Sequence, residues 1–76
     1  MIMPNKNITM RYSLLHCGAL LLAELKAPDT VSSLREKTKD QEALSNYEKF
    51  ILTLDYLFAL GIITLHDGLI VRCSDA

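Results

Sequence analysis

Two short β-branched segments, separated by an Asp-Gly pair, constrain the fold of this chain more than any other feature. The segments are ITLH at residues 63–66 and LIVR at residues 69–72, and Asp67-Gly68 lies between them. Asp-Gly is favoured in the type I′ turn of a two-residue β-hairpin. Because an isolated hairpin is only marginally stable, residues 6–10 are expected to add a short third strand. The turn predicts four facing pairs: His66 with Leu69, Leu65 with Ile70, Thr64 with Val71, and Ile63 with Arg72.

A first helix is expected over residues 12–26, with Ser13 as its N-cap. The side of this helix opposite its core face carries Ala19 and Ala23. The helix is therefore apolar nearly all round and is expected to be covered on both sides. Gly18 in a helix interior costs about 1 kcal/mol relative to alanine. It indicates either another backbone that approaches closely or, more simply, space for a large side chain of the same core. At 100° per residue the core face consists of Leu14, Cys17, Gly18, Leu21 and Leu25.

Pro28 separates the first helix from a second one. Asp29 or Thr30 is expected to cap this second helix, which ends near Thr38 after about two turns. Its inward side consists of Val31, Leu34 and the stem of Arg35.

The third helix is expected to run from Ser45 to Leu60, and Gly61 is placed for a left-handed C-terminal cap. The sequence SNYE at residues 45–48 matches the capping box, although a start near Gln41 is the alternative. The expected core face consists of Tyr47, Phe50, Ile51, Leu54, Leu57 and Phe58.

The order helix, short helix, longer helix and hairpin predicts a mainly α fold with a C-terminal β-hairpin, a winged helix-turn-helix. A three-helix bundle with an appended hairpin is the alternative. With 76 residues the chain is expected to form one domain over residues 1–76, with a folded unit at about 8–73. A domain of this size buries only about 60% of its unfolded surface, so its stability is marginal and often depends on a partner.

The outward side of the third helix bears on function. In a winged helix that reads DNA, this helix enters the major groove with polar and basic side chains. Here the outward side is apolar, and Glu48 and Asp55 flank it, which would repel phosphate. The pattern favours a protein interface, unless the N-terminal segment folds back over it. The predicted interface consists of Leu52, Tyr56, Ala59 and Lys49 on the third helix, and Ala19 and Ala23 on the first.

Composition argues against several other functions. Eight Lys and Arg against nine Asp and Glu give a net charge of −1, whereas nucleic-acid modules usually carry a basic excess. No apolar run is long enough to span a bilayer, and the first twelve residues do not resemble a secretory signal. We therefore expect a cytoplasmic protein with reduced Cys17 and Cys73, each acting as a small hydrophobic residue. His16 and His66 lie on different elements, so no metal site, cofactor or catalytic residue is expected.

Three segments together resemble a known family: SLLHCGALLLAEL at 13–25, PDTVSSL at 28–34, and the apolar helix and GLIVR strand at 50–72. The chain resembles the middle component 6 proteins of bacterial ABC-three component systems. One departure is Arg35, where an aromatic residue is expected after the T-V-S-x-L box.

The resemblance implies an adaptor without catalytic residues. Its partners would be an SMC- or Rad50-like ABC ATPase and an effector, in a system related to Lamassu-type defence against phages or plasmids. Self-association also stays open. The alternative function is that of a small DNA-binding winged-helix regulator, which the charge of the chain disfavours.

Overall fold

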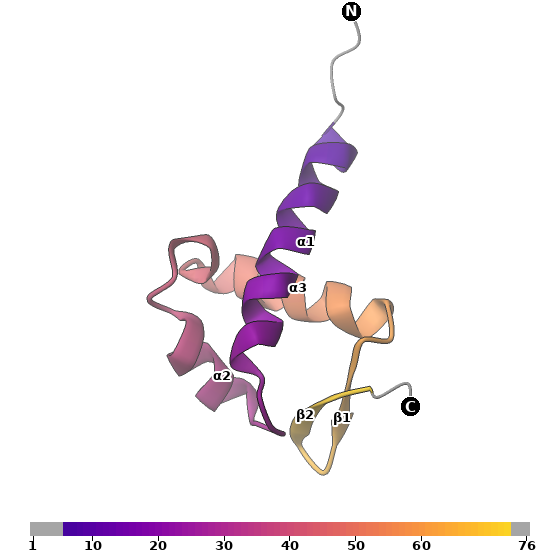
Figure 1. The fold of residues 1–76 in the computed structure, drawn as a ribbon. Helices are drawn as coiled ribbons and strands as arrows, with labels where there is room; N and C mark the ends of the chain where they lie inside the picture. The colour runs from indigo at the N-terminus through magenta and orange to yellow at the C-terminus, as the bar shows by residue number, and fades with distance from the viewer. Residues whose placement is uncertain (1–5, 74–76) are drawn as a thin grey trace, which may run out of the picture.

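The computed structural model of the protein describes the backbone of residues 6–73 and the side chains of residues 11–73. These residues form a mainly helical structure with a C-terminal, two-stranded antiparallel hairpin, as predicted. Helix α1 crosses α3, and its N-terminal half extends beyond the rest of the molecule (Figure 1). The elements in chain order are α1 (Lys6–Glu24), α2 (Val31–Thr38), the 3₁₀ helix η1 (Glu42–Leu44), α3 (Tyr47–Ala59), β1 (Ile63–His66) and β2 (Leu69–Arg72).

The hairpin has the predicted register in all four pairs. Its turn residues Asp67 and Gly68 have φ values of 55° and 78°, as a type I′ turn requires. The predicted third strand at residues 6–10 is wrong, because these residues belong to α1. The neighbour of β2 is instead Asp29, which exchanges two backbone hydrogen bonds with Ile70, at 3.2 and 2.6 Å. A single residue before α2 thus joins the outer edge of β2.

Helix α1 begins at Lys6, so the prediction that Ser13 caps it is wrong and Ser13 lies in its interior. β-Branched residues lower helix propensity only slightly, and the helix continues through Ile8 and Thr9. At the other end α1 stops at Glu24, two residues before the predicted Lys26. No basic residue lies in its last turn.

Arg72 of β2 supplies the missing charge at the C-terminus of α1. Its Nε donates to the carbonyl oxygen of Leu25 over 3.1 Å, and its Nη2 donates to that of Leu22. A cation at this end of a helix is favourable, because the helix dipole makes the last carbonyl groups negative. The side chain of Arg72 therefore joins the hairpin to α1.

The core lies between α1, α2, α3 and the hairpin. Gly18 makes room for a side chain of this core, which was the simpler of its two interpretations: a Cβ atom there would lie 3.2 Å from Cδ2 of Leu57. Leu14, which was predicted to be buried, is only half-buried. The buried apolar residues are Cys17, Leu21, Leu25, Leu34, Leu44, Phe50, Leu54, Leu57, Ile63 and Ile70.

The prediction that Asp29 or Thr30 caps α2 is confirmed for Thr30, whose Oγ1 atom accepts a hydrogen bond from the amide of Ser33 over 3.0 Å. The predicted capping box at the start of α3 is wrong. Ser45 donates to the carbonyl of Glu42 in η1, and the N-cap is Asn46, whose Oδ1 accepts from the amide of Lys49 over 3.1 Å. Residues from Gln41 onward do not extend α3, because η1 is a separate turn.

The loop between α2 and α3 is held by Arg35. Its two terminal nitrogens donate to the carbonyl oxygens of Leu44 and Ser45, at 2.6 and 2.7 Å. The guanidinium carbon also lies 5.4 Å from the ring centres of both Tyr47 and Phe50. Arginine at this position therefore closes the loop and covers the start of α3.

Candidate interaction surface

The outward face of α3 differs in composition from the predicted one. Thr53 is buried. Its hydroxyl can leave water because it donates a hydrogen bond to the carbonyl of Lys49 over 2.7 Å. Tyr47 was predicted to be in the core but is 58% exposed. The buried side of α3 is therefore rotated toward Thr53. The exposed residues opposite it are Glu48, Leu52, Asp55 and Ala59, which we call the α3 face.

The α3 face alternates between apolar and acidic side chains. Leu52 is 47% exposed and Ala59 is also exposed, as predicted. Tyr56 and Lys49 are only half-buried and lie at one edge of the face, so Tyr56 is not its centre. The carboxylates of Glu48 and Asp55 take part in none of the ion pairs between the described residues. The two acids are therefore part of the face itself.

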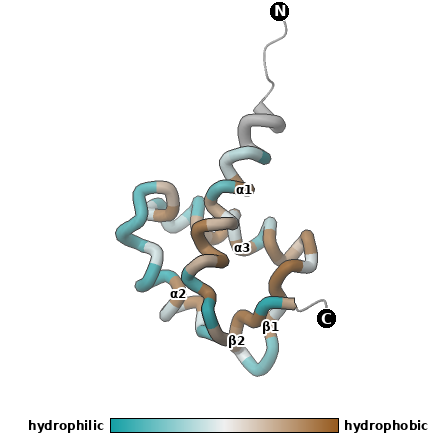
Figure 2. The backbone as a smooth tube through the Cα atoms, viewed as in Figure 1, coloured by the Kyte–Doolittle hydropathy of each residue, from teal (hydrophilic) through white to brown (hydrophobic). Residues whose placement is uncertain are grey.

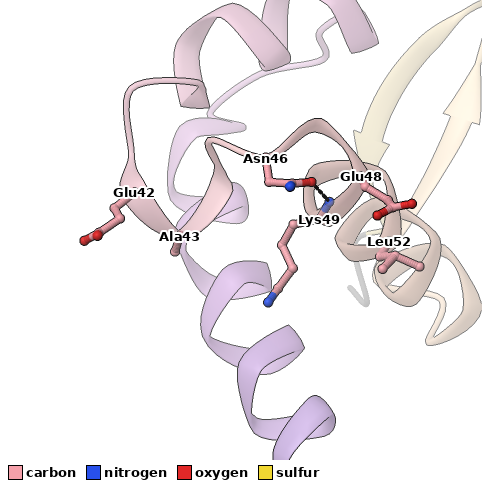
Figure 3. A pocket seen from close by; sticks show the side chains of 6 residues that line it. All are labelled: Glu42, Ala43, Asn46, Glu48, Lys49 and Leu52. Atoms are coloured by element: carbon pink, nitrogen blue, oxygen red, sulfur yellow. Dashed lines mark hydrogen bonds between the residues drawn. The ribbon is translucent and has the colours of Figure 1, made fainter.

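An open depression of about 410 Å³ lies beside this face, between η1 and the start of α3. Figure 3 shows its side chains: Glu42 and Glu48 point away from each other, and Lys49 extends toward α1. A small-molecule site needs a few polar groups that converge on one point. These groups diverge, so the depression suits contact with a broad surface better than capture of a small ligand. It is lined by Glu42, Ala43, Asn46, Glu48, Lys49 and Leu52.

A second apolar face lies on α1. Ala19 and Ala23 are exposed, as predicted, and the structure adds two larger side chains to them. Tyr12 is 70% exposed and Leu15 is 52% exposed. We call these four residues the α1 face. Tyr12 and Leu15 were not among the predicted interface residues, because the helix was expected to start near Tyr12, and Leu15 was placed only at the flank of this side. The spacing of Tyr12, Leu15 and Ala19 at i, i+3 and i+7 was the signal that could have found them.

The structure does not bring the two predicted halves of the interface together. Helices α1 and α3 pack against each other, with Gly18 of α1 next to Leu57 of α3, and the exposed residues of each helix lie opposite the buried residues of that helix. The α1 face and the α3 face therefore point in different directions. The alternative in which the N-terminal segment folds back over α3 does not hold for residues 6–10, because they continue α1. Residues 1–5 lie outside the described residues.

Most of the remaining exposed apolar surface gathers near the hairpin. Figure 2 shows hydrophobic residues at the end of α3 and along the strands, with a hydrophilic hairpin tip. Leu65 is 56% exposed, and Leu60 and Ile62 are also exposed. These residues were not among the predicted interface residues. The sequence feature that could have indicated them is the absence of charged residues from Ile62 to Leu65.

Two ion pairs order the segment around α2. Nζ of Lys37 lies 2.9 Å from Oδ2 of Asp29, and Nζ of Lys39 lies 2.9 Å from Oε1 of Glu36. The hydrogen bond from Lys37 lowers the pKa of Asp29, and that from Lys39 lowers the pKa of Glu36. The bond with Glu36 raises the pKa of Lys39 in turn. Asp29 thus combines an ion pair with the backbone bridge to the hairpin.

The two histidines of residues 11–73 lie on different elements, and the two cysteines differ in exposure. His16 is exposed on α1, and His66 lies 3.4 Å from Asp67 at the exposed hairpin tip. Cys17 is buried and 3.5 Å from the carbonyl oxygen of Ala43. Cys73 is exposed, so its predicted role as a small hydrophobic residue is wrong for this position. Within residues 11–73, no three His, Cys, Asp or Glu side chains gather as metal ligands would. The absence of a metal and of a disulfide stays a prediction.

By its fold, the chain is a small, mainly helical protein with a C-terminal hairpin and several exposed apolar faces. It belongs to the family described as ABC-three component (ABC-3C) system Middle Component 6, whose model matches residues 3–73. Comparison with curated proteins and with solved structures found no match. No helix among the described residues is long and apolar enough to cross a membrane.

Proposed function

We propose that this protein is a non-enzymatic adaptor of an ABC-three component system, acting in the cytoplasm. Its partners in this proposal are an SMC- or Rad50-like ABC ATPase and an effector, in a system that defends bacteria against phages or plasmids. The family supports membership of a multi-component system. The observation that carries the adaptor role is the pair of apolar faces on α1 and α3, which point in different directions.

We further propose that the fold is a winged helix. The order of three helices and a hairpin supports this interpretation. So does the backbone bridge between Asp29 and Ile70, which places a third, one-residue strand beside the hairpin. In this interpretation α3 corresponds to the helix that enters DNA in DNA-binding relatives, and the hairpin corresponds to the wing.

The composition of the α3 face favours a protein partner over DNA. Glu48 and Asp55 lie on it beside Leu52. Phosphate groups would meet two negative charges there, whereas neutralising phosphates is the main source of non-specific DNA affinity. A partner surface with an apolar centre and basic residues around it would match the face in both respects. The role of a DNA-binding regulator has no comparable support from the described residues.

The adaptor proposal can be tested by co-purification of the chain with the ATPase and the effector of its own system. Leu52→Lys changes the α3 face, and the new lysine follows Glu48 at i+4, a spacing that keeps the helix stable. Leu15→Lys changes the α1 face. Each variant is expected to lose one partner and to keep the other, because exposed apolar anchors at an interface centre contribute most of the affinity.

Leu65→Lys is the matched control, since Leu65 is an exposed leucine outside both faces. It is expected to keep both partners at the wild-type yield. Thermal melts of all three variants confirm that they are folded. The proposal fails if Leu52→Lys and Leu15→Lys both retain both partners, or if both lose the same one.

A further inference from the structure

The outer edge of β1 carries backbone groups that the described residues leave without a partner. Ile70 directs its amide and carbonyl groups toward Asp29, so the facing pair of Ile70 and Leu65 has no hydrogen bond between its members. Leu65 therefore points its own amide and carbonyl groups away from β2. By alternation along the strand, Ile63 does the same. Such a row of groups is a template with which another extended strand can pair.

The edge also lacks the features with which proteins usually block strand pairing. Lysine, proline and bulges on an edge strand prevent another strand from adding to it. The segment Ile62-Ile63-Thr64-Leu65 has no charged residue and no proline, and the β1–β2 register contains no bulge. Leu65 lies on the same side of the sheet as the buried Ile63 but is itself 56% exposed. The apolar inner side of the sheet thus ends at an open edge.

We propose that β1 pairs antiparallel with β1 of a second copy of this chain, which produces a continuous four-stranded sheet. The edge is complementary to itself. With the two-fold axis at Thr64, Ile63 faces Leu65 of the second copy, and Leu65 faces its Ile63. The four outward backbone groups of one copy then bond those of the other. The exposed Leu65 side chain gains an apolar neighbour on the inner side of the sheet.

The charge and the side-chain chemistry of the edge fit a second copy as well. Thr64 would face Thr64 of the other copy, a favourable cross-strand pair. No like charges would meet where residues 63–65 of the two copies pair with one another, because these residues are uncharged. A hairpin of two strands is only marginally stable by itself. A sheet of four strands with one apolar side is more stable. This self-association uses neither the α1 face nor the α3 face, so it is independent of the proposed adaptor role.

Disulfide trapping tests the register. The pair at Thr64 has no hydrogen bond between its members, and Cα atoms in such pairs are about 4.5 Å apart, within the range that a disulfide spans. In the full chain with Cys73→Ser, Thr64→Cys is expected to form an intermolecular disulfide in mild oxidant. His66→Cys is the control, because its two copies would lie roughly 13 Å apart along the strands. Cys17 is buried and stays unchanged.

Analytical ultracentrifugation supplies the second measurement. The wild-type chain is expected to form dimers reversibly, and Leu65→Lys is expected to weaken the association by about tenfold or more. Leu52→Lys, which changes the α3 face only, is expected to leave it unaltered. Any of three results would overturn the proposal: a monomer at every concentration, dimers that Leu65→Lys does not weaken, or disulfides that form as readily at residue 66 as at residue 64.

Discussion

Arg35 shows how one side chain can hold a loop through several contacts at once. The sequence predicts that its stem faces inward, and the structure adds two hydrogen bonds from its guanidinium to the carbonyls of Leu44 and Ser45. The same group lies beside the rings of Tyr47 and Phe50. Periodicity identified the position, but the backbone carbonyls that it binds are nine and ten residues away. A distant contact of this kind has no local signal in a single sequence.

Replacing Arg35 with lysine should therefore destabilise the protein. Lysine keeps the charge but lacks the planar fork that binds two carbonyls while lying against aromatic rings. We expect Arg35→Lys to lower the free energy of unfolding by about 1–2 kcal/mol, measured by urea titration. Lys39→Ala, which removes an exposed ion pair with Glu36, is the control and should change it little. Equal stability of Arg35→Lys and the wild type would show that the loop does not depend on this side chain.

At the scale of elements, local signals determined the hairpin and α2 but not the limits of α1 and α3. The Asp-Gly turn fixes the register within a few residues of chain, and Thr30 caps α2 directly. The start of α1 depends on a helix that extends beyond the core, where β-branched residues suggested a strand. The buried side of α3 depends on Thr53, whose hydroxyl is satisfied within the helix. Because hydrophobic periodicity treats threonine as polar, it leaves Thr53 out of the buried side of α3 and so predicts the outward side incorrectly.

Asp29 links α2 to the hairpin and should make the stability of this junction depend on pH. Its pKa is lowered in the folded state, chiefly by the hydrogen bond from Lys37. The resulting stabilisation is present above the unfolded pKa of about 3.9 and is lost as the pH falls through the lower, folded pKa.

We therefore expect Asp29→Asn to flatten the loss of thermal stability between about pH 5 and pH 2. The substitution keeps the backbone bridge to Ile70, so the fold persists. Glu36→Gln, which removes the other lowered carboxyl pKa, provides a comparison that does not touch the hairpin. Melting temperatures measured across this range decide the matter. An Asp29→Asn profile as steep as that of the wild type would contradict the assignment.

At the scale of the whole molecule, the candidate surfaces could be predicted only in part. The sequence identified the apolar character of Leu52, Ala59, Ala19 and Ala23, because helical periodicity leaves them opposite a core. It could not show that they form two separate faces, since that depends on how α1 crosses α3. The open edge of β1 depends on which side Asp29 occupies beside β2, a pairing across about 40 residues of chain. Local patterns do not contain that information.

The distribution of charge over the molecule predicts weak binding to DNA. The net charge is −1, and acidic residues lie on the α3 face and at the hairpin tip. Non-specific DNA binding depends on cations that displace counterions from phosphate. We expect no saturable binding of a labelled duplex in fluorescence anisotropy at low salt with tens of micromolar protein, a concentration that usually suffices for non-specific binders. Submicromolar affinity that falls steeply with salt would favour the DNA-binding regulator instead.

In the proposed assembly, two faces of one small chain join two different partners. Site-specific photo-crosslinking in the assembled complex tests this arrangement. A benzophenone side chain is placed at residue 52 on the α3 face, at residue 15 on the α1 face, or at the exposed residue 36 of α2 as the control. We predict that position 52 crosslinks to one of the two partners, the ATPase or the effector, that position 15 crosslinks to the other, and that position 36 crosslinks to neither. Crosslinks from positions 52 and 15 to the same partner, or at the yield of position 36, would contradict this arrangement.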